Sequence, residues 1–151
     1  MDDDMREVLE TFSAESAEHI QKATDCILLL EGNPDEETTN SLFRTFHTIK
    51  GNSLMLGFSR IGELAHAVEN VMARLCDGSL ILSKQVIDLL LAFSDTIGTL
   101  IAEQTQGIDE GSSFKGLIAA LNAVFNRTES PRIFSSAVKK QKTASKPFLN
   151  N

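Results

Sequence analysis

Three residues about one third of the way along the chain have the types and the spacing that phosphoryl chemistry requires. His47, Lys50 and Gly51 lie at positions i, i+3 and i+4, so they share one face if this stretch is helical. A neutral imidazole has one nitrogen that donates a hydrogen bond and one whose lone pair accepts. Lys50 is placed to balance the charge of an arriving phosphoryl group. Glycine inside a helix costs about 1 kcal/mol relative to alanine, so Gly51 suggests close approach of another backbone or of a ligand beside His47.

A second group of polar residues lies further along the chain. Glu63, His66, Glu69 and Asn70 flank an apolar stripe, and in an antiparallel helix pair Glu69 or His66 could face His47. A carboxylate that accepts a hydrogen bond from Nδ1–H of His47 would fix the tautomer and leave the Nε2 lone pair pointing outward. This combination predicts a nucleophilic histidine that accepts a phosphoryl group.

Helical periodicity dominates the segments that must position these groups. Apolar residues recur at spacings of three, four and seven, and no segment shows the period of two that is typical of strands. The apolar stripe of the first helix includes Met5, Val8 and Phe12. The predicted helices cover residues 5–31, 35–54, 59–76 with Ser59 as N-cap, a stretch from Ser83 to the loop at 104–113, and 114–126. Four long amphipathic helices joined by short turns predict an all-α fold, an up-down four-helix bundle with an additional C-terminal fifth helix.

Charge is divided unevenly along the chain. All 21 Asp and Glu residues precede residue 131, whereas five of the 14 Lys and Arg residues follow residue 130, so residues 1–130 carry a net charge of −12 and residues 131–151 carry +5. The acidic part would repel nucleic-acid phosphates, which argues against nucleic-acid binding. From residue 128 the sequence is polar, basic and interrupted by proline, as is typical of a linker. We therefore predict a helical domain over residues 1–127, a basic flexible tail over residues 128–151, and a longer protein of which this is an N-terminal part.

The sequence has no signature of secretion or of membrane insertion. It contains no run of about 18 apolar residues, and its N-terminus lacks the basic and apolar regions of a signal peptide. Cys26 and Cys76 both fall within predicted helices, where we expect buried, reduced thiols. These features predict a cytoplasmic protein.

Three short motifs carry a resemblance to a known family. Residues 42–53 read Leu-Phe-Arg-Thr-Phe-His-Thr-Ile-Lys-Gly-Asn-Ser, residues 56–58 read Leu-Gly-Phe, and residues 64–70 read Leu-Ala-His-Ala-Val-Glu-Asn. In this order and spacing the motifs resemble the histidine-phosphotransfer (HPt) domain, and they are most similar to the one at the N-terminus of chemotaxis-type histidine kinases (CheA). The departure is Asn52-Ser53, where the family usually has small residues.

The resemblance implies a role for each residue of the candidate site. His47 would be the phosphoacceptor and would attack the γ-phosphate of ATP through Nε2. Glu69 would hold the Nδ1 proton, and Lys50 and His66 would complete the polar cluster around the imidazole. Gly51 would leave the phosphoryl group a free path to the ring.

The same resemblance implies the partners. The chain has no Gly-rich phosphate loop and no kinase signature, so no cofactor or metal is expected in this chain, and ATP and Mg²⁺ would be bound by partner domains. The donor would be the catalytic domain of a histidine kinase, of which this chain would be a fragment. The acceptor would be an aspartate of a response-regulator receiver domain similar to CheY. The docking surface for these partners would include Phe43, Arg44 and Leu54.

Three other functions fit parts of the pattern. Glu63 and His66 match the Glu-x-x-His element of di-iron and di-manganese bundles, but such sites need this element on two helices and a Glu from each of two more, and the sequence has no second copy of it. A helical interaction module without chemistry would explain the bundle and the tail, but not Gly51 or the clustered polar face. A free-standing phosphorelay shuttle would use His47 in the same way without an attached kinase.

Overall fold

The computed structural model describes residues 2–108 and 111–129, and in these ranges the chain forms five α-helices and no strand. The helices are α1 (Asp3–Gly32), α2 (Glu36–Met55), α3 (Ser59–Cys76), α4 (Lys84–Thr105) and α5 (Lys115–Glu129). The predicted all-α class is therefore confirmed, and every predicted helix is present with ends within a few residues of those expected. Most of the tail predicted over residues 128–151 lies outside the described residues.

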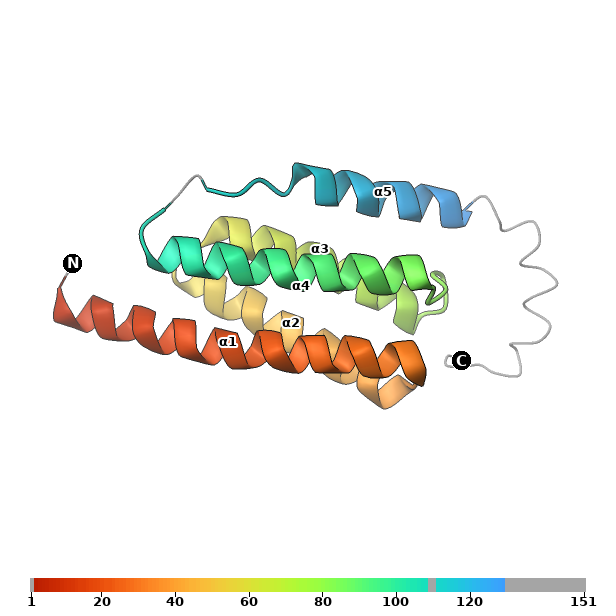
Figure 1. Cartoon of the computed structure of the whole chain (residues 1–151), viewed down its shortest axis with the longest axis horizontal. Helices are drawn as coiled ribbons and strands as arrows, with labels where there is room; N and C mark the ends of the chain where they lie inside the picture. Colours follow the sequence, from red (N-terminus) through yellow and green to blue (C-terminus); the bar gives the residue numbers. More distant parts are fainter. Residues whose placement is uncertain (1, 109–110, 130–151) are drawn as a thin grey trace.

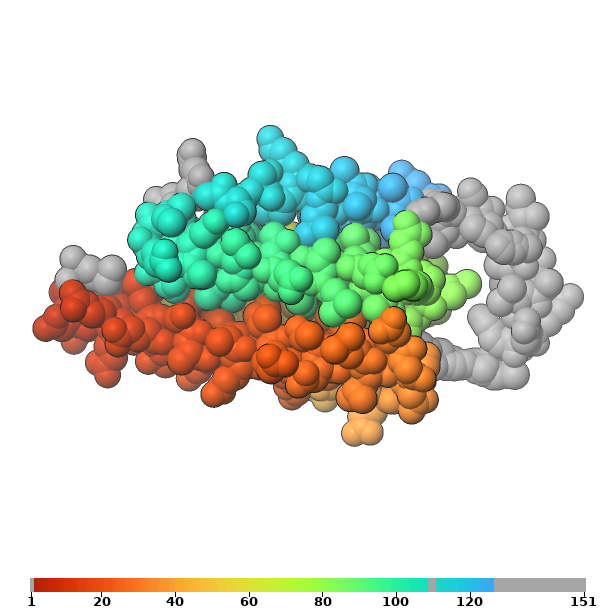
Figure 2. Space-filling model, in the orientation of Figure 1, coloured from red at the N-terminus to blue at the C-terminus, as the bar shows by residue number. Residues whose placement is uncertain are grey.

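The first four helices form an up-down bundle, and α5 packs on its outside (Figure 1). Short connections make successive helices antiparallel neighbours. Helix α2 packs against α1 and α3, and α4 packs against α1, α3 and α5. Figure 2 shows α1, α4 and α5 side by side on one face of the molecule, and α2 and α3, which carry the candidate site, lie behind them in Figure 1.

The apolar stripes of the helices meet in a single core. The predicted stripe of α2 is confirmed, because Leu42, Phe46 and Ile49 are all buried. The prediction for the start of α1 is wrong, because Phe12 is buried but Met5 and Val8 are 46% and 43% exposed. The first turns of α1 reach the end of the bundle, where Met5 borders a groove instead of the core.

Three helices begin at a side-chain cap. The caps of α1, α2 and α4 each accept a hydrogen bond from the backbone N–H three residues later, at 2.8, 2.8 and 3.2 Å respectively. These bonds satisfy N–H groups that no carbonyl inside the helix reaches. The capping residues are Asp2, Asp35 and Ser83.

The start of α3 differs from the prediction. Ser59, the expected N-cap, is the first helical residue, and the cap is Phe58, whose side chain makes no capping hydrogen bond. The ring of Phe58 packs against the ring of Phe12 in α1, with centroids 5.5 Å apart. The residue before α3 is therefore anchored to α1 by a ring contact, and α3 begins without a side-chain cap.

The cap at Asp35 predicts a pH-dependent contribution to stability. Its carboxylate accepts hydrogen bonds from the backbone N–H and the hydroxyl of Thr38 at 2.8 and 2.9 Å, and the backbone bond first, then the hydroxyl bond, hold the pKa of Asp35 below its usual value. A group whose pKa is lowered by folding stabilises the fold above its unfolded-state pKa, near 4, and loses that contribution as the pH falls through its folded-state pKa. We expect Asp35→Ala to lower the free energy of unfolding at pH 7 and to differ less from the wild type at pH 3, measured by urea unfolding.

The matched control for that experiment is Asp35→Asn. Asparagine can still accept the bond from Thr38 N–H but does not titrate. The difference in unfolding free energy between the Asn and Ala variants should therefore stay constant between the two pH values. If the difference in unfolding free energy between the wild type and Asp35→Ala is the same at pH 7 and at pH 3, the assigned role of the Asp35 carboxylate is wrong.

Helix α5 is held to the bundle by apolar and cation–π contacts. Leu121 is buried. The guanidinium groups of Arg60 and Arg74, both in α3, lie over the rings of Phe114, which directly precedes α5, and Phe125, which is in α5, at 5.6 and 4.1 Å from the ring centroids. Such contacts are worth about 0.5–1 kcal/mol each at exposed sites, so they supplement the apolar packing and fix α5 along α3 and α4.

Helix α4 is the one helix in the described part of the chain that is long and apolar enough, by length and composition alone, to cross a membrane. Its 18-residue window has a mean hydropathy of 1.5, although 44% of that window is buried inside the bundle. The core helix of a water-soluble protein meets the same criterion. Phe93, Ile97 and Leu100 of α4 are fully buried, so packing in the bundle accounts for its apolar character.

The two cysteines differ in exposure. Cys26 is buried and free, as predicted, but Cys76 is free and exposed, so its predicted burial is wrong. Cys76 is the last residue of α3, where the helix leaves the core. Its Sγ lies 3.6 Å from Oδ1 of Asn40. Partial desolvation there, followed by the charges of Asp77 and Glu36, raises the pKa of the thiol.

Candidate functional site

Glu69 of α3 is the centre of the polar cluster. Its side chain is only 9% exposed, and its two carboxylate oxygens have different partners. Oε2 lies 2.9 Å from Nδ1 of His47, and Oε1 accepts a hydrogen bond from Nζ of Lys50 at 2.8 Å. Burying a carboxylate without partners is costly, so these two contacts are what allow Glu69 to lie at this depth between α2 and α3.

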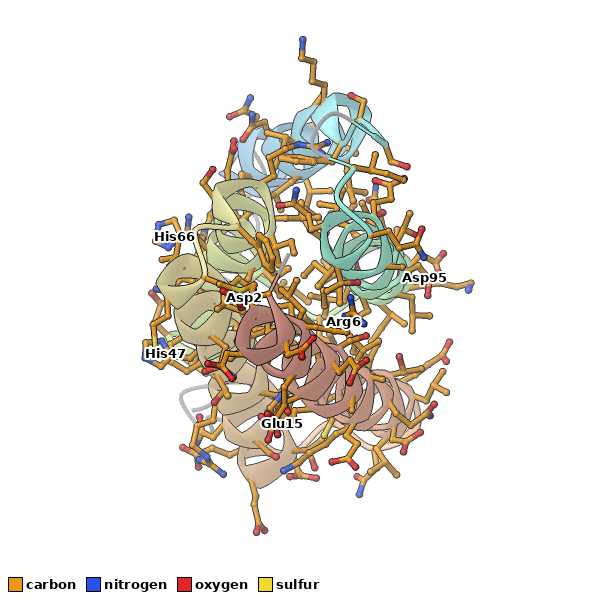
Figure 3. The ribbon with its side chains drawn as sticks, turned by 90° about the vertical axis from the view of Figure 1, so that its left-hand side faces the viewer. Asp2, Arg6, Glu15, His47, His66 and Asp95 are labelled. Atoms are coloured by element: carbon orange, nitrogen blue, oxygen red, sulfur yellow. The ribbon has the colours of Figure 1, made fainter. Side chains whose placement is uncertain are left out.

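The imidazole of His47 is held on one side and open on the other. Because an ionised carboxylate can only accept, the Nδ1 of a neutral ring must carry the hydrogen and donate it to Glu69. This tautomer leaves a lone pair on Nε2. The side chain is 64% exposed, and Figure 3 shows His47 at the outer surface of the bundle, on the same side as His66. The ring therefore presents an unprotonated nitrogen to solvent.

Lys50, which lies one turn along α2 from His47, is bound to the carboxylate of Glu69. Its ammonium group donates to Glu69, and its side chain is 21% exposed. The sequence suggested that Lys50 balances the charge of an incoming phosphoryl group. In the free domain its charge is already paired with Glu69, so any contact with phosphate must share or replace that bond.

His66 lies at the edge of the cluster. Its Nδ1 is 3.9 Å from Oε1 of Glu69, which is too long for a hydrogen bond, and its side chain is 61% exposed. The two therefore attract each other only when the ring of His66 is protonated. Of the two residues that the sequence left open as partners of His47, the structure selects Glu69.

Gly51 follows the cluster on the exposed face of α2. An ideal Cβ built on Gly51 meets no atom of the described chain within 4 Å, so no second backbone approaches it. The cost of a glycine in this helix is therefore not explained by packing inside the domain. Space for a group that comes from outside is the other explanation that the sequence suggested.

The three predicted docking residues differ in how far they reach into solvent. Phe43 is half-buried, with its ring stacked on that of His47 at a centroid distance of 6.3 Å and an interplanar angle of 13°. Arg44 is exposed, and Leu54 is 52% exposed. The stacking contact was not foreseen, although the i, i+4 spacing of Phe43 and His47 is the signal that could have revealed it.

Gly62 of α3 is a structural residue of this region that the sequence analysis did not single out. A Cβ at this position would lie 2.5 Å from Cδ2 and 2.9 Å from Cγ of Leu54. The missing side chain therefore lets Leu54 rest against the backbone of α3. Its signal in the sequence is a glycine inside the apolar stripe of an otherwise regular helix.

We expect Gly62→Ala to change the free energy of unfolding by less than about 1 kcal/mol, because alanine gains about 1 kcal/mol in helix propensity while the half-exposed Leu54 can move aside. The matched control is Gly98→Ala in α4, where a new Cβ meets nothing within 4 Å and the same gain should appear as a net stabilisation. Urea unfolding measures both. A loss above about 2 kcal/mol for Gly62→Ala, as in overpacked cores, would contradict this description of Leu54.

The metal alternative finds no support in the arrangement of donor side chains. Across residues 2–108 and 111–129, no three His, Cys, Asp or Glu side chains come together in a group that could hold a metal ion. Glu63, which completes the Glu-x-x-His string, is exposed.

The sequence matches a known family over most of its length. Residues 7–111 match the Hpt domain. The chain is 32% identical over 121 residues to the chemotaxis protein CheA of Bacillus subtilis, and 28% identical over 120 residues to CheA of Listeria monocytogenes. These alignments cover 80% and 79% of this chain but 17% and 19% of the two relatives, so the chain spans about a fifth of the length of the curated relatives it matches.

Solved structures of the same kind share the fold. The CheA phosphotransferase domain from Thermotoga maritima is 32% identical with a TM-score of 0.63, over 66% of this chain and 95% of that domain. A histidine phosphotransfer domain of CheA solved in solution is 29% identical with a TM-score of 0.70, and the match covers 79% of this chain and 92% of that domain. The phosphorylated P1 domain of CheA3 in complex with CheY6 from R. sphaeroides is 23% identical with a TM-score of 0.69, and the match covers 83% of this chain and 98% of that domain. At this identity the match shows that the two share a fold. Because the family match covers residues 7–111 of a 151-residue chain with this bundle, the chain belongs to the Hpt domain family of histidine phosphotransfer domains.

Proposed function

We propose that Nε2 of His47 accepts the γ-phosphoryl group of ATP from a histidine kinase catalytic domain and passes it to an aspartate of a response-regulator receiver domain. One observation carries this proposal. Nδ1 of His47 is 2.9 Å from the carboxylate of Glu69, while the side chain of the histidine is 64% exposed. A ring held in this way has its nucleophilic nitrogen fixed by tautomer and accessible to a partner.

The first step forms a bond between Nε2 and phosphorus. The Nε2 lone pair attacks the γ-phosphorus as the bond from phosphorus to the bridging oxygen breaks, and ADP leaves with that electron pair. The imidazole becomes positively charged because Nδ1 keeps its hydrogen. Glu69, already 2.9 Å from Nδ1, stabilises that charge without having to move.

The second step reverses the bonding at His47. A carboxylate oxygen of the receiver aspartate attacks phosphorus, the bond between Nε2 and phosphorus breaks, and its electron pair returns to Nε2. The aspartate becomes an acyl phosphate and His47 a neutral ring. Since Nδ1 of His47 keeps its hydrogen in both steps and donates it to Glu69 as a hydrogen bond, the domain itself exchanges no proton with solvent.

The neighbouring residues have supporting roles in this scheme. Lys50 partly offsets the charge of Glu69 and adds positive charge one helical turn from the phosphoryl group. Gly51 leaves space along α2, since nothing would contact even a Cβ there. His66, which is not hydrogen-bonded to Glu69, borders the approach to the ring and has the smallest role.

Partners supply what this chain does not carry. ATP and Mg²⁺ are bound by the kinase and receiver domains, and no cofactor is assigned to this chain. Two findings favour a kinase in the same protein over a free-standing shuttle: the curated relatives are CheA proteins, and this chain spans about a fifth of them. A structural neighbour, the P1 domain of CheA3, is solved in complex with CheY6, which supports a CheY-like receiver. The proposed reaction uses ATP, and both cysteines are free thiols. Both features support a cytoplasmic location.

Docking of both partners is assigned to the face of α2 around His47. Phe43, Arg44 and Leu54 present an aromatic, a cationic and an apolar side chain along this face. Aromatic and arginine side chains are common anchors of protein interfaces. The apolar side chains supply contact area, and the guanidinium of Arg44 suits a carboxylate on the partner.

Labelling tests the proposed function. Incubation with the cognate kinase domain and ATP labelled in the γ-phosphate should label this chain, and peptide mapping should place the label on His47. A phosphoramidate is lost in acid and survives alkali, whereas a phosphoserine does the opposite, so alkali-labile, acid-stable label would contradict the proposal. Label obtained from a phosphorylated receiver but not from any kinase would favour the shuttle.

A further inference from the structure

An apolar groove with a volume of about 280 Å³ lies at one end of the bundle, where α1 begins, α2 turns into α3 and α4 ends. Its apolar lining is formed by Met5, Leu9, Met55, Leu56 and Phe58. Met55 is 84% exposed and Met5 is 46% exposed. Apolar side chains gathered in this way, in place of single scattered residues, form a surface to which another apolar group can bind.

The start of α1, which borders this groove, is rich in acidic side chains. The first three turns of α1 and its cap carry five exposed carboxylates and one cation, Arg6. Figure 3, which looks onto this end of the molecule, shows Asp2 near the middle of the end face with Arg6 beside it. The groove therefore favours an occupant that combines apolar and basic residues. The five carboxylates are those of Asp2, Asp3, Asp4, Glu7 and Glu10.

The segment that follows α5 has this composition. Residues 131–151 contain five Lys and Arg residues and no Asp or Glu. Near the end of the given sequence, residues 146–149 read Lys-Pro-Phe-Leu, which places an aromatic and an aliphatic side chain directly after a lysine. The net charge of this segment is +5, whereas the net charge of residues 1–130 is −12.

The length of the segment permits the contact. Helix α5 ends at Glu129, at the end of the bundle opposite the groove (Figure 1). Its 15 residues span about 22 Å, so the chain must return by at least that distance. Residues 130–148 reach about 60 Å when extended, but residues 130–134 reach only about 17 Å. Phe148 can therefore reach the groove, whereas Phe134, the other phenylalanine of the segment, cannot.

We propose that residues 146–149 dock in the groove formed by Met5, Leu9, Met55, Leu56 and Phe58, with the lysines of the segment attracted to the carboxylates at the start of α1. The docking is intramolecular, so an effective concentration in the millimolar range allows even weak contacts to be populated. Salt weakens it, because the Debye length falls from about 10 Å at 0.1 M to about 3 Å at 1 M. The proposal does not rest on phosphotransfer, and it predicts competition between the tail and any partner that covers the end of α2.

Methionine methyl groups offer a direct test in the full chain. The protein has four methionines, of which Met5 and Met55 line the groove and Met72 is fully buried in the core. With ¹³C-methyl-labelled methionine, Phe148→Ser should shift the NMR signals of Met5 and Met55 and leave Met72 in place. Met5→Leu and Met55→Leu assign the signals. Raising the salt concentration to 1 M should move the wild-type signals toward those of Phe148→Ser.

Phe134→Ser is the matched control, since it removes the same side chain from a position that cannot reach the groove, and it should leave Met5 and Met55 unshifted. Wild-type Met5 and Met55 signals that coincide with those of Phe148→Ser at low salt would overturn the proposal. A shift that disappears on tenfold dilution would overturn it in favour of a second copy of the chain as the occupant. Equal shifts from Phe134→Ser and Phe148→Ser would show a nonspecific effect of the tail and would equally overturn it.

Discussion

Replacing His47 with Gln should abolish phosphorylation of this domain by its kinase. The glutamine side chain can donate an amide N–H to Oε2 of Glu69, so the buried carboxylate keeps a partner and the bundle stays folded. Its amide nitrogen has no lone pair available for attack on phosphorus. We therefore expect a loss of label of at least about 1,000-fold, which corresponds to roughly 4 kcal/mol of lost transition-state stabilisation.

The other two histidines of the chain provide the controls for this result. His19→Gln in α1 should be labelled like the wild type. His66→Gln should also retain its label, because Nδ1 of His66 is 3.9 Å from Glu69 and forms no hydrogen bond that fixes His47. Label on His47→Gln, or its disappearance from His66→Gln alone, would show that the wrong histidine has been assigned.

Replacing Glu69 with Gln should slow phosphorylation about ten- to hundredfold while the helix content by far-UV circular dichroism stays unchanged. The substitution removes the charge that stabilises the phosphorylated imidazole, and the amide can turn its NH₂ group toward Nδ1 of His47. That orientation would force the hydrogen of the ring onto Nε2 and block the attacking nitrogen. Hydrogen bonds to charged groups contribute about 1.5–3 kcal/mol, and 1.4 kcal/mol corresponds to a factor of ten, which sets the expected range.

Two measurements separate this mechanism from a general loss of structure. ¹⁵N NMR of His47 should report the Nδ1–H tautomer in the wild type and a shift toward the Nε2–H tautomer in Glu69→Gln. Glu63→Gln removes the same charge from an exposed position on the same helix and should be phosphorylated at the normal rate. Normal phosphorylation of Glu69→Gln would refute the tautomer argument even if the domain carries its phosphate on His47.

Most of the fold follows from local properties of the chain. A helix repeats every 3.6 residues, so its apolar stripe is visible in the sequence, and caps such as Asp35 and Ser83 are local contacts between residues three apart. Local rules failed where the tertiary surroundings differ from those of an average helix. Phe58, and not Ser59, precedes α3, and its ring packs against Phe12. Met5 is exposed because α1 begins at the end of the bundle.

The candidate site divides in the same way. Helical spacing alone was enough to predict a shared face for His47, Lys50 and Gly51. The residue types alone were enough to predict the chemistry of an imidazole beside a carboxylate. Which carboxylate oxygen contacts which partner depends on the rotation and the axial position of α3 relative to α2. The burial of apolar residues on both helices sets this rotation and this position. That packing brings Glu69 within hydrogen-bond distance of Nδ1 of His47 and leaves His66, three residues earlier, 3.9 Å from the same carboxylate. It also engages Lys50 with Glu69, because a carboxylate that is 9% exposed is stable only when both of its oxygens are bound.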